Sequence, residues 1–413
     1  MDYNNYNTFT LPNGLRIIHL PSASPVLYCG YGINAGTRDE LPGEEGLAHF
    51  CEHTTFKGTA RRKAWHILNC LERVGGDLNA FTTKEETVYY ASILGEHVAR
   101  AVDLLTDIVF NSCYPQQEID KEVAVICDEI ESYNDSPSEL IYDDFENLVF
   151  GGHPLGHNIL GQAEQLHTYT AADALRFTRR FYRPDNAVFF AYGNIDFTRL
   201  VSLLRRATAG LEGGTPTLDT ADTATTLPPY EPQELAVSKG THQTHVLIGT
   251  RTYSVFDQKR MALYLLNNVL GGPGMNARLN LSLREHNGLV YTVDSSMVNY
   301  SDTGVWCVYF GCDPHDVGRC RRLVRKELDR LMLRPMSAAQ LAAAKKQLKG
   351  QVAVAGDNRE NFALGFAKSY LHYGWKKDVN RLFEQIDALT ADDLQQVANE
   401  VFDQRKLTTL MFK

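Results

Sequence analysis

The sequence predicts an α+β fold of two tandem homologous domains, each an antiparallel or mixed sheet covered by helices. Three observations support this prediction. The 413 residues exceed what a single hydrophobic core usually serves. Short sequence patterns recur with a constant offset in the numbering, and a stretch without apolar periodicity separates the two copies.

Two segments with the pattern of a helix-capping box, 170–173 (TAAD) and 390–393 (TADD), show the repeat most clearly. We call this difference in residue number, from 170 to 390, the repeat offset. We expect each segment to begin a helix, and a strand-like run follows at Ala187 in the first copy and at Leu407 in the second. The strand-like runs around Val26 and Val246 are related by the same repeat offset. Two copies of one fold explain the shared offset more simply than a chance similarity of short patterns.

The domain boundaries follow from the repeat and from the stretch between its copies. We expect an N-terminal domain over residues 1–212, a linker over 213–232 that is rich in Gly, Pro, Thr and Asp, and a C-terminal domain over 233–413. Within each domain, β-rich segments alternate with capped helices. The step from Asn13 to Gly14 is typical of a tight turn between the first two strands.

Composition and charge argue against several classes of protein. The formal net charge is −9 and there is no long run of Lys or Arg, so we expect no nucleic-acid partner. The first ten residues lack the basic start and apolar core of a secretory signal, and no stretch is apolar enough to span a bilayer. The eight Cys residues include no Cys-x-x-Cys pair, as expected of reduced thiols. We therefore expect a cytoplasmic protein without a membrane partner.

The segment 46–53 (GLAHFCEH) has the pattern of a metal site on a helix. Acidic residues directly before it, Glu44 and Glu45, favour a helix N-terminus. At 100° per residue, His49 and His53 point within about 40° of each other, so both imidazoles can reach one metal ion.

Glu52 and Cys51 lie between these two histidines and receive different roles. A catalytic zinc needs three protein ligands, an open position for water, and a nearby carboxylate that is not on the metal. Glu52 suits that carboxylate. Cys51 is rotated roughly 200° from His49, so we expect it in the core and not on the metal.

The third ligand must come from another segment, and the acid-rich helical stretch 122–131 is the candidate. Glu122 and Glu129 are seven residues apart and share a helical face, whereas Asp128 and Glu131 point elsewhere and read as solvated charges. The pattern alone leaves both Glu122 and Glu129 open as the ligand.

The motif 49–53 (HFCEH) and the segment 55–59 (TFKGT) after it resemble the pitrilysin/insulysin family of inverted-motif zinc metallopeptidases. The short-subunit type, which includes mitochondrial processing peptidase, is the most similar. In that family the third ligand is a Glu about 75 residues after the second His. The separation here is 76, which selects Glu129, and Glu122 then matches a second acidic residue that orients a ligand or assists catalysis.

The resemblance implies one Zn²⁺ per subunit, held by His49, His53 and Glu129, with Glu52 as the general base. The segment 74–82 (VGGDLNAFT) also resembles a family segment, an exposed edge strand beside the zinc that takes up an extended peptide. The residues concerned would be Leu78, Asn79, Ala80 and Phe81, which would bind the peptide through main-chain hydrogen bonds. Without the resemblance, this segment would read as a turn that enters an ordinary strand.

In the second half, the segment 271–296 resembles the family segment that carries an Arg and a Tyr seven residues apart, here Arg284 and Tyr291. We expect Asn287 and Gly288 to end a helix, so that Arg284 lies in its last turn and Tyr291 on the next strand. The resemblance implies that Tyr291 donates to the scissile carbonyl or its oxyanion and that Arg284 holds the substrate backbone. In short-subunit members this domain belongs to the partner subunit. Because this one chain retains both the complete zinc motif and the Arg/Tyr pair, a homodimer is favoured over a division of labour between two different subunits.

Three other patterns suggest sites that we do not expect. The run 271–275 (GGPGM) lacks the Gly-Lys-Ser/Thr ending and the preceding strand of a phosphate-binding loop. Pro and Gly in 153–157 (HPLGH) break the helix that would align its two histidines, so a loop is favoured over a second metal site. His242 and His245 lie beside a strand-like run and are expected to be structural.

These observations predict a zinc-dependent endopeptidase that hydrolyses peptides or unfolded polypeptides, in which Glu52 passes a proton from water to the leaving amine. The main alternative is a noncatalytic peptide-binding or structural subunit of the same fold, a reading that an intact zinc motif disfavours. A hydrolase of non-peptide amides or esters is a further alternative, because fold alone does not fix the substrate.

Overall fold

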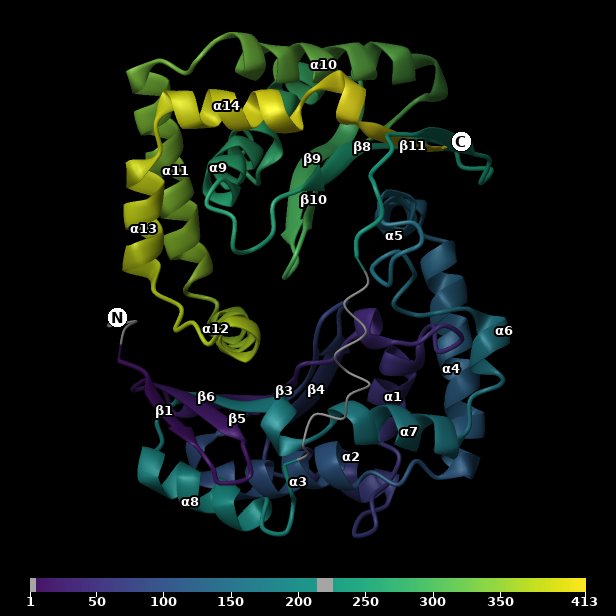
Figure 1. The fold of residues 1–413 in the computed structure, drawn as a ribbon, viewed down its shortest axis with the longest axis vertical. Coiled ribbons are helices and arrows are strands. Elements are labelled where there is room, and N and C mark those ends of the chain that lie inside the picture. The colour runs from purple at the N-terminus through teal and green to yellow at the C-terminus, as the bar shows by residue number, and fades with distance from the viewer. Residues whose placement is uncertain (1–4, 214–225) are drawn as a thin grey trace. The chain divides into compact units, whose positions relative to one another are not determined.

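The computed structural model describes residues 5–213 and 226–413 (Figure 1). Most of the predicted linker, 214–225, lies outside the described residues. The chain forms two compact units. The first contains the described residues up to Glu131, those from His157 to Thr226 and those from Gly356 to Asp378; the second contains the remaining three segments. No helix among the described residues is long and apolar enough to cross a membrane.

The first unit is built on a six-stranded mixed sheet in the order β1-β2-β6-β3-β5-β4. Only the pair β2 and β6 is parallel. Within the part of the chain that the structure describes, β4 pairs with β5 alone and is therefore an edge strand. The strands are β1 (Asn7–Thr10), β2 (Arg16–Pro21), β3 (Val26–Ile33), β4 (Asp77–Thr82), β5 (Thr87–Leu94) and β6 (Ala187–Gly193).

The helices of this unit lie on both faces of its sheet. They are α1 (Leu47–Thr55), α2 (Ala64–Glu72), α3 (Val98–Asn111), α4 (Gln116–Asn134), α6 (Ala163–Leu166), α7 (Ala171–Phe181), α8 (Phe197–Ala207) and α12 (Arg359–Tyr373). The last three residues of α4 belong to the second unit.

Successive side chains of a strand point to opposite faces of a sheet, and both faces of the first sheet are covered. Tyr31 on β3 packs edge to face against Phe189 on β6 and Phe110 on α3. The next residue of β6, Phe190, instead contacts Phe366 on α12. α3 and α12 therefore cover opposite faces, as Figure 1 shows.

The second unit is built on a five-stranded mixed sheet in the order β7-β11-β8-β10-β9, in which only β7 and β11 are parallel. Its strands are β7 (Glu234–Val237), β8 (Thr244–Thr252), β9 (Val290–Asn299), β10 (Gly304–Cys312) and β11 (Thr408–Phe412). Its helices are α5 (Pro137–Val149), α9 (Arg260–Gly271), a π-helix over Asn280–Glu285, α10 (Val317–Leu333), α11 (Ala338–Ala355), α13 (Val379–Ala388) and α14 (Ala391–Val401).

The two repeats exchange one helix. α5 comes from the first half of the chain but packs on β8 and β11 of the second unit. α12 comes from the second half and packs on β3 and β6 of the first unit. The repeat offset takes Pro137–Val149 to 357–369, which overlaps α12, so the exchange is reciprocal. The predicted contiguous boundaries describe the repeats of the sequence and remain a prediction.

The predicted α+β class with two sheets covered by helices is confirmed. Both capping-box segments begin helices, α7 after Thr170 and α14 after Thr390, and each helix is followed by the expected strand, β6 or β11. The tight turn between β1 and β2 contains Gly14 at a φ of +88°, a conformation that favours Gly over other residues.

Candidate metal centre

The N-terminus of α1, the helix of the zinc motif, is held by a carboxylate from the preceding loop. Glu40 accepts hydrogen bonds from the backbone N–H groups of Gly46 at 3.0 Å and Ala48 at 2.7 Å. The first N–H groups of a helix have no partner inside the helix, so this carboxylate satisfies them and also complements the positive end of the helix dipole.

Glu44 and Glu45, which we expected at this helix end, bond to the loop before it. Their carboxylates accept from the backbone N–H groups of Leu41 and Gly43, respectively. The expectation that the helix begins here is confirmed. The carboxylate that accepts hydrogen bonds from its first N–H groups is that of Glu40, which we did not predict. A capping box joins residues that are three positions apart, whereas Glu40 lies six positions before Gly46. A search for capping boxes therefore does not find Glu40.

A histidine also contacts the carboxylate of Glu40. His157 Nε2 lies 2.7 Å from Glu40 Oε2, and the Glu40 side chain is fully buried. Burial raises the pKa of Glu40, while His157 and the two backbone donors oppose that rise. His157 lies in the predicted loop after α5, where His153 Nδ1 accepts from the N–H of Leu155. The loop prediction is confirmed, and His157 is a positioning residue that sequence reasoning missed.

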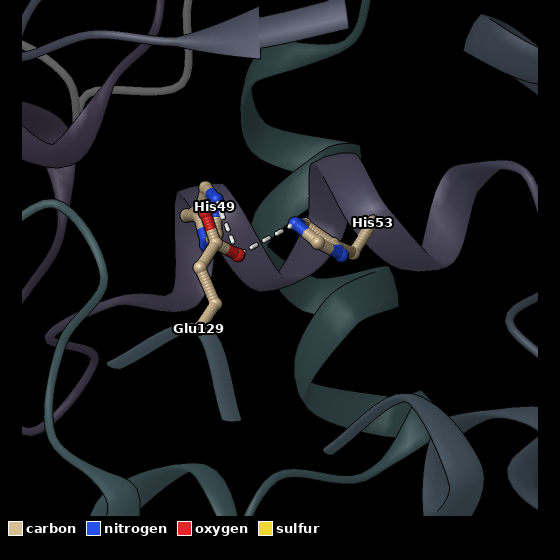
Figure 2. A group of neighbouring side chains, drawn as sticks. All are labelled: His49, His53 and Glu129. Atoms are coloured by element: carbon tan, nitrogen blue, oxygen red, sulfur yellow. Dashed lines mark ion pairs between the residues drawn. The ribbon is translucent and has the colours of Figure 1, made fainter. Parts of the chain in front are cut away.

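His49 and His53 of α1 and Glu129 of α4 come together as the sequence predicted (Figure 2). Glu129 Oε2 lies 3.3 Å from His53 Nε2 and 3.9 Å from His49 Nε2. The helical spacing aligns the two imidazoles, whose ring centroids are 4.5 Å apart. One potential ligand atom from each residue thus lies within 4.8 Å of the other two.

Glu122, which shares a helical face with Glu129, fixes the orientation of His53. Its Oε1 lies 3.0 Å from His53 Nδ1, and its Oε2 lies 2.5 Å from Lys57 Nζ. Burial would raise the pKa of Glu122, but the hydrogen bonds from His53 and Lys57 outweigh burial and lower it. The resulting carboxylate keeps the proton of His53 on Nδ1 and leaves Nε2 free for a metal.

The two histidines have opposite pKa shifts. Burial, with a smaller contribution from His53, lowers the pKa of His49 to about 3. Burial also acts to lower the pKa of His53, but the hydrogen bond to Glu122 and the charges of Glu52 and Glu129 outweigh it and raise the pKa. His49 is therefore held as the neutral imidazole that binds metals.

Glu52 lies beside the cluster and is not one of its three members. Its side chain is almost completely buried, and Oε2 accepts a hydrogen bond of 2.7 Å from Thr82 Oγ1 on β4. Burial raises the pKa of Glu52, partly offset by the Thr82 hydrogen bond and the charge of His53. A buried carboxylate with a raised pKa can take up and return a proton, as a general base requires. Thr82 was not foreseen, because strand β4 meets α1 only in the folded protein.

The neighbouring residues that we expected away from the metal are away from it. Cys51 is fully buried in the hydrophobic core, where burial raises the pKa of its thiol. Asp128 and Glu131 are exposed on α4.

The predicted edge strand is present next to this cluster. Leu78, Asn79, Ala80 and Phe81 lie in β4, which packs against α1 and is hydrogen-bonded on one side only, to β5. Thr82, at the end of the same strand, donates a hydrogen bond to Glu52. The edge strand β4 therefore lies next to the candidate base.

Arg284 and Tyr291 occupy the expected elements in the second unit. Arg284 lies in the π-helix Asn280–Glu285, and Tyr291 lies in β9. Gly288 between them has a φ of +62° and ends the helical segment, as predicted. The Arg284 guanidinium lies 5.5 Å from the centre of the Tyr291 ring, a cation–π contact, and Tyr291 is 79% exposed.

The donor set and its spacing suit zinc. Two imidazoles and one carboxylate are the ligands of many catalytic zinc sites. Tetrahedral zinc with bonds of about 2.0–2.1 Å places its ligand atoms about 3.3 Å apart. Glu129 Oε2 to His53 Nε2, at 3.3 Å, matches that spacing, and Glu129 Oε2 to His49 Nε2, at 3.9 Å, exceeds it by about 0.6 Å. Nδ1 of His49 is buried without a hydrogen-bond partner among the described residues, so its ring is not committed elsewhere by hydrogen bonding.

Comparison with known proteins places this chain in a family. The family described as insulinase (peptidase family M16) matches residues 19–163, and the one described as peptidase M16 inactive domain matches residues 168–348. The chain belongs to the M16 peptidase family, as the sequence resemblance implied.

The relatives of the chain include proteins named zinc proteases. An uncharacterized zinc protease of Streptomyces coelicolor is 33% identical over 406 residues, which cover 96% of this chain and 87% of that protein. The uncharacterized zinc protease YmxG of Bacillus subtilis is 30% identical, with 95% of each chain covered. The crystal structure of a protease from Helicobacter pylori has a TM-score of 0.89 at 22% identity over 99% of both chains, and confirms the fold alone.

Proposed function

We propose that this chain is a zinc-dependent endopeptidase that hydrolyses peptides or unfolded polypeptide segments. One observation carries the proposal: a candidate metal triad from α1 and α4 lies beside a buried carboxylate of α1 that is not part of it, next to a free strand edge. A metal-assisted hydrolase needs this separation between ligands and base. The zinc-protease names of the relatives support the same conclusion.

His49, His53 and Glu129 would hold one Zn²⁺ per chain, with Glu122 orienting His53 through Nδ1. When bound, zinc supplies a Lewis acid that polarises the scissile carbonyl and lowers the pKa of water. Glu52 then accepts the proton of the attacking water and donates it to the leaving amine. Its raised pKa favours the return of that proton.

The edge of β4 would bind the substrate as an added strand. The unpaired backbone groups of 78–81 can hydrogen-bond an extended peptide with little demand on its sequence. A folded protein does not offer such a strand, which favours peptides and unfolded segments. Small amides and esters cannot bind as an added strand, so this mode of binding favours peptides over them.

Arg284 and Tyr291 would assist from a second copy of the chain. We propose that the chain forms a homodimer in which Tyr291 donates to the oxyanion and Arg284 holds the substrate backbone, as the family resemblance implies. Mixing two inactive variants, Glu52→Gln and Tyr291→Phe, tests this. If the residues act across the dimer, mixed dimers contain one complete site and activity returns. No recovery on mixing, with subunit exchange verified, would contradict the proposal.

The catalytic proposal is tested by mass-spectrometric cleavage of an unstructured peptide mixture with zinc-loaded protein. Glu52→Gln should retain zinc but cut internal bonds at least about 100-fold more slowly, because the general base is lost. Glu131→Gln, an exposed carboxylate on α4, is the matched control and should cut normally. If the zinc-loaded wild type cuts no peptide, the noncatalytic alternative replaces the proposal.

A further inference from the structure

The second unit contains a cationic cavity that the proposed catalytic chemistry does not use. It has a volume of about 660 Å³ and lies between α10, the π-helix and the segment that joins α10 to α11. This volume is within the usual range for small-ligand sites of about 300–1,000 Å³. Its charged and titratable lining consists of Arg278, His286, Lys326, Glu327, Arg330 and Arg334.

Among the described residues, most of these positive charges form no ion pair. Glu327, the one carboxylate of the lining, pairs with Arg330 at 2.8 Å. Within the described part of the chain, no hydrogen bond or ion pair engages the side chains of Arg278, Lys326 or Arg334. Four cations face one anion, so the lining has a formal charge of +3 with His286 counted as neutral.

Arg278 distinguishes this cavity from a solvated helix surface. Lys326, Arg330 and Arg334 are exposed, as helix-surface charges usually are, but Arg278 is partly buried. Burial lowers the pKa of Arg278; Glu327 acts in the opposite direction, and Arg330 adds to the lowering. Holding a guanidinium partly out of water beside other cations is unfavourable unless an anion completes the site.

The positive charge is not a requirement of the fold. α10 occupies the place in the second repeat that α3 occupies in the first, since the repeat offset takes Val98–Asn111 to 318–331. α3 contains one cation, Arg100, whereas α10 and the residue after it contain seven: Arg319, Arg321, Arg322, Arg325, Lys326, Arg330 and Arg334. This accumulation occurs in a chain whose net charge is −9.

We propose that this cavity binds a small multivalent oxyanion, a ligand with two or more phosphate or carboxylate groups. The planar guanidinium of Arg278 would hold one oxyanion group through two parallel hydrogen bonds, and Lys326 and Arg334 would neutralise the other. The proposal does not depend on peptidase activity, because every residue of the lining belongs to the second unit.

Isothermal titration of the full-length zinc-loaded protein tests the proposal at about 150 mM salt, where loose surface electrostatics are largely screened. Fructose 1,6-bisphosphate is the phosphate probe and tricarballylate the carboxylate probe. At least one should bind with a Kd below about 1 mM. The probe that binds more tightly identifies the chemistry of the natural ligand.

The variants separate a defined site from general attraction to a basic helix. Lys326→Gln combined with Arg334→Gln changes only exposed side chains, so the fold should persist, and binding should weaken at least about tenfold. Arg278→Lys keeps the charge but removes the planar fork, and should also weaken binding. Arg322→Gln, an exposed cation of α10 outside this cavity, should change binding less than about twofold.

Two results would overturn the proposal. One is that neither probe binds the wild-type protein. The other is that Arg322→Gln weakens binding as much as the change at Lys326 and Arg334, which would show attraction to the helix as a whole.

Discussion

The two repeats share their framework and differ at the two helices that contain the candidate metal ligands in the first repeat. α7 and α14 correspond residue for residue at the repeat offset, and α4 and α11 correspond within two residues. The first helix after the β3 or β8 strand is α1 in one repeat and α9 in the other. α1 and α4 contain the candidate ligands, whereas α9 and α11 contain no His, Cys, Asp or Glu.

This difference separates what the fold needs from what the chemistry needs. His49, Glu52 and Glu122 are buried polar groups, and burying such groups costs free energy unless they are paired. The second repeat forms the same architecture without them, so the framework does not require them. Their presence in the first repeat is therefore best explained by a function that uses them.

The largest effect that this comparison predicts is on zinc content. His53→Ala should lower bound zinc from one ion per chain to none and abolish peptide cleavage, because two protein ligands do not retain a catalytic zinc. The second repeat has one possible cluster of its own among the described residues, Asp313, His315 and Asp316, but it is mostly exposed. His315→Ala should leave zinc content unchanged, as measured by inductively coupled plasma mass spectrometry. Loss of zinc in His315→Ala would contradict the comparison.

A second prediction concerns the exchanged helix α12. Burial alone would raise the pKa of Glu86, but the hydrogen bond with His372 and the charge of Lys368 outweigh it and lower the pKa to about 2. Such a carboxylate stabilises the folded state fully above its unfolded pKa of about 4.5, and this stabilisation is lost as the pH falls toward about 2. The shift corresponds to about 3 kcal/mol at neutral pH.

Hydrogen exchange of the α12 amides in wild type and Glu86→Gln measures this contribution. The opening free energy of α12 should differ between the two proteins by about 3 kcal/mol near neutral pH, and the difference should shrink steadily below about pH 4.5. A difference that does not change with pH would show that the Glu86 contacts stabilise α12 by packing alone.

A third, smaller effect is expected from the carboxylate that supports His53. Glu122→Gln should weaken zinc binding about 10- to 100-fold, because the amide orients His53 Nδ1 less strongly and leaves Lys57 without its anion. Competition with a chromophoric chelator measures the affinity. Glu118→Gln, one turn earlier on α4 and outside the cluster, should have no effect. Equal affinity in Glu122→Gln and wild type would remove Glu122 from the site.

The smallest effect should be the same in both repeats. The hydroxyl groups of Thr170 and Thr390 each donate to the Asp three residues later at 2.7 Å, and that Asp also accepts from the backbone N–H of the Thr in both segments. Thr170→Ala and Thr390→Ala should each lower the free energy of local unfolding at the start of its helix by about 1 kcal/mol. Hydrogen exchange at the start of α7 and α14 checks this. If the two decreases in free energy differ by more than about 1 kcal/mol, the same capping pattern stabilises the two helices to different extents.

Local features were the most predictable from the sequence. The capping boxes, the turn at Gly14 and the helix of the zinc motif depend on residues within a few positions of one another, and all three appear in the structure. The arrangement of His49 and His53 also followed from helical spacing alone. Glu129 needed the family resemblance, because spacing left Glu122 equally open.

Features that depend on distant segments were not predicted. α5 and α12 occupy overlapping positions in the two sequence repeats, although each belongs to the unit formed mainly by the other repeat. The sequence repeat alone therefore predicts contiguous domains. Glu40 reaches the start of α1 together with His157, which is far away in the sequence, and Thr82 reaches Glu52 from β4. Each of these contacts joins polar residues whose partners are set by tertiary structure.

X-ray absorption at the zinc edge of the purified protein tests the central claim most directly. We expect one zinc per chain with two imidazole nitrogens at about 2.0–2.1 Å, further oxygen ligands, and no sulfur, together with loss of this signal in His53→Ala. Zinc–sulfur scattering at about 2.3 Å, or an unchanged signal in His53→Ala, would place the metal elsewhere and contradict the assignment of His49, His53 and Glu129.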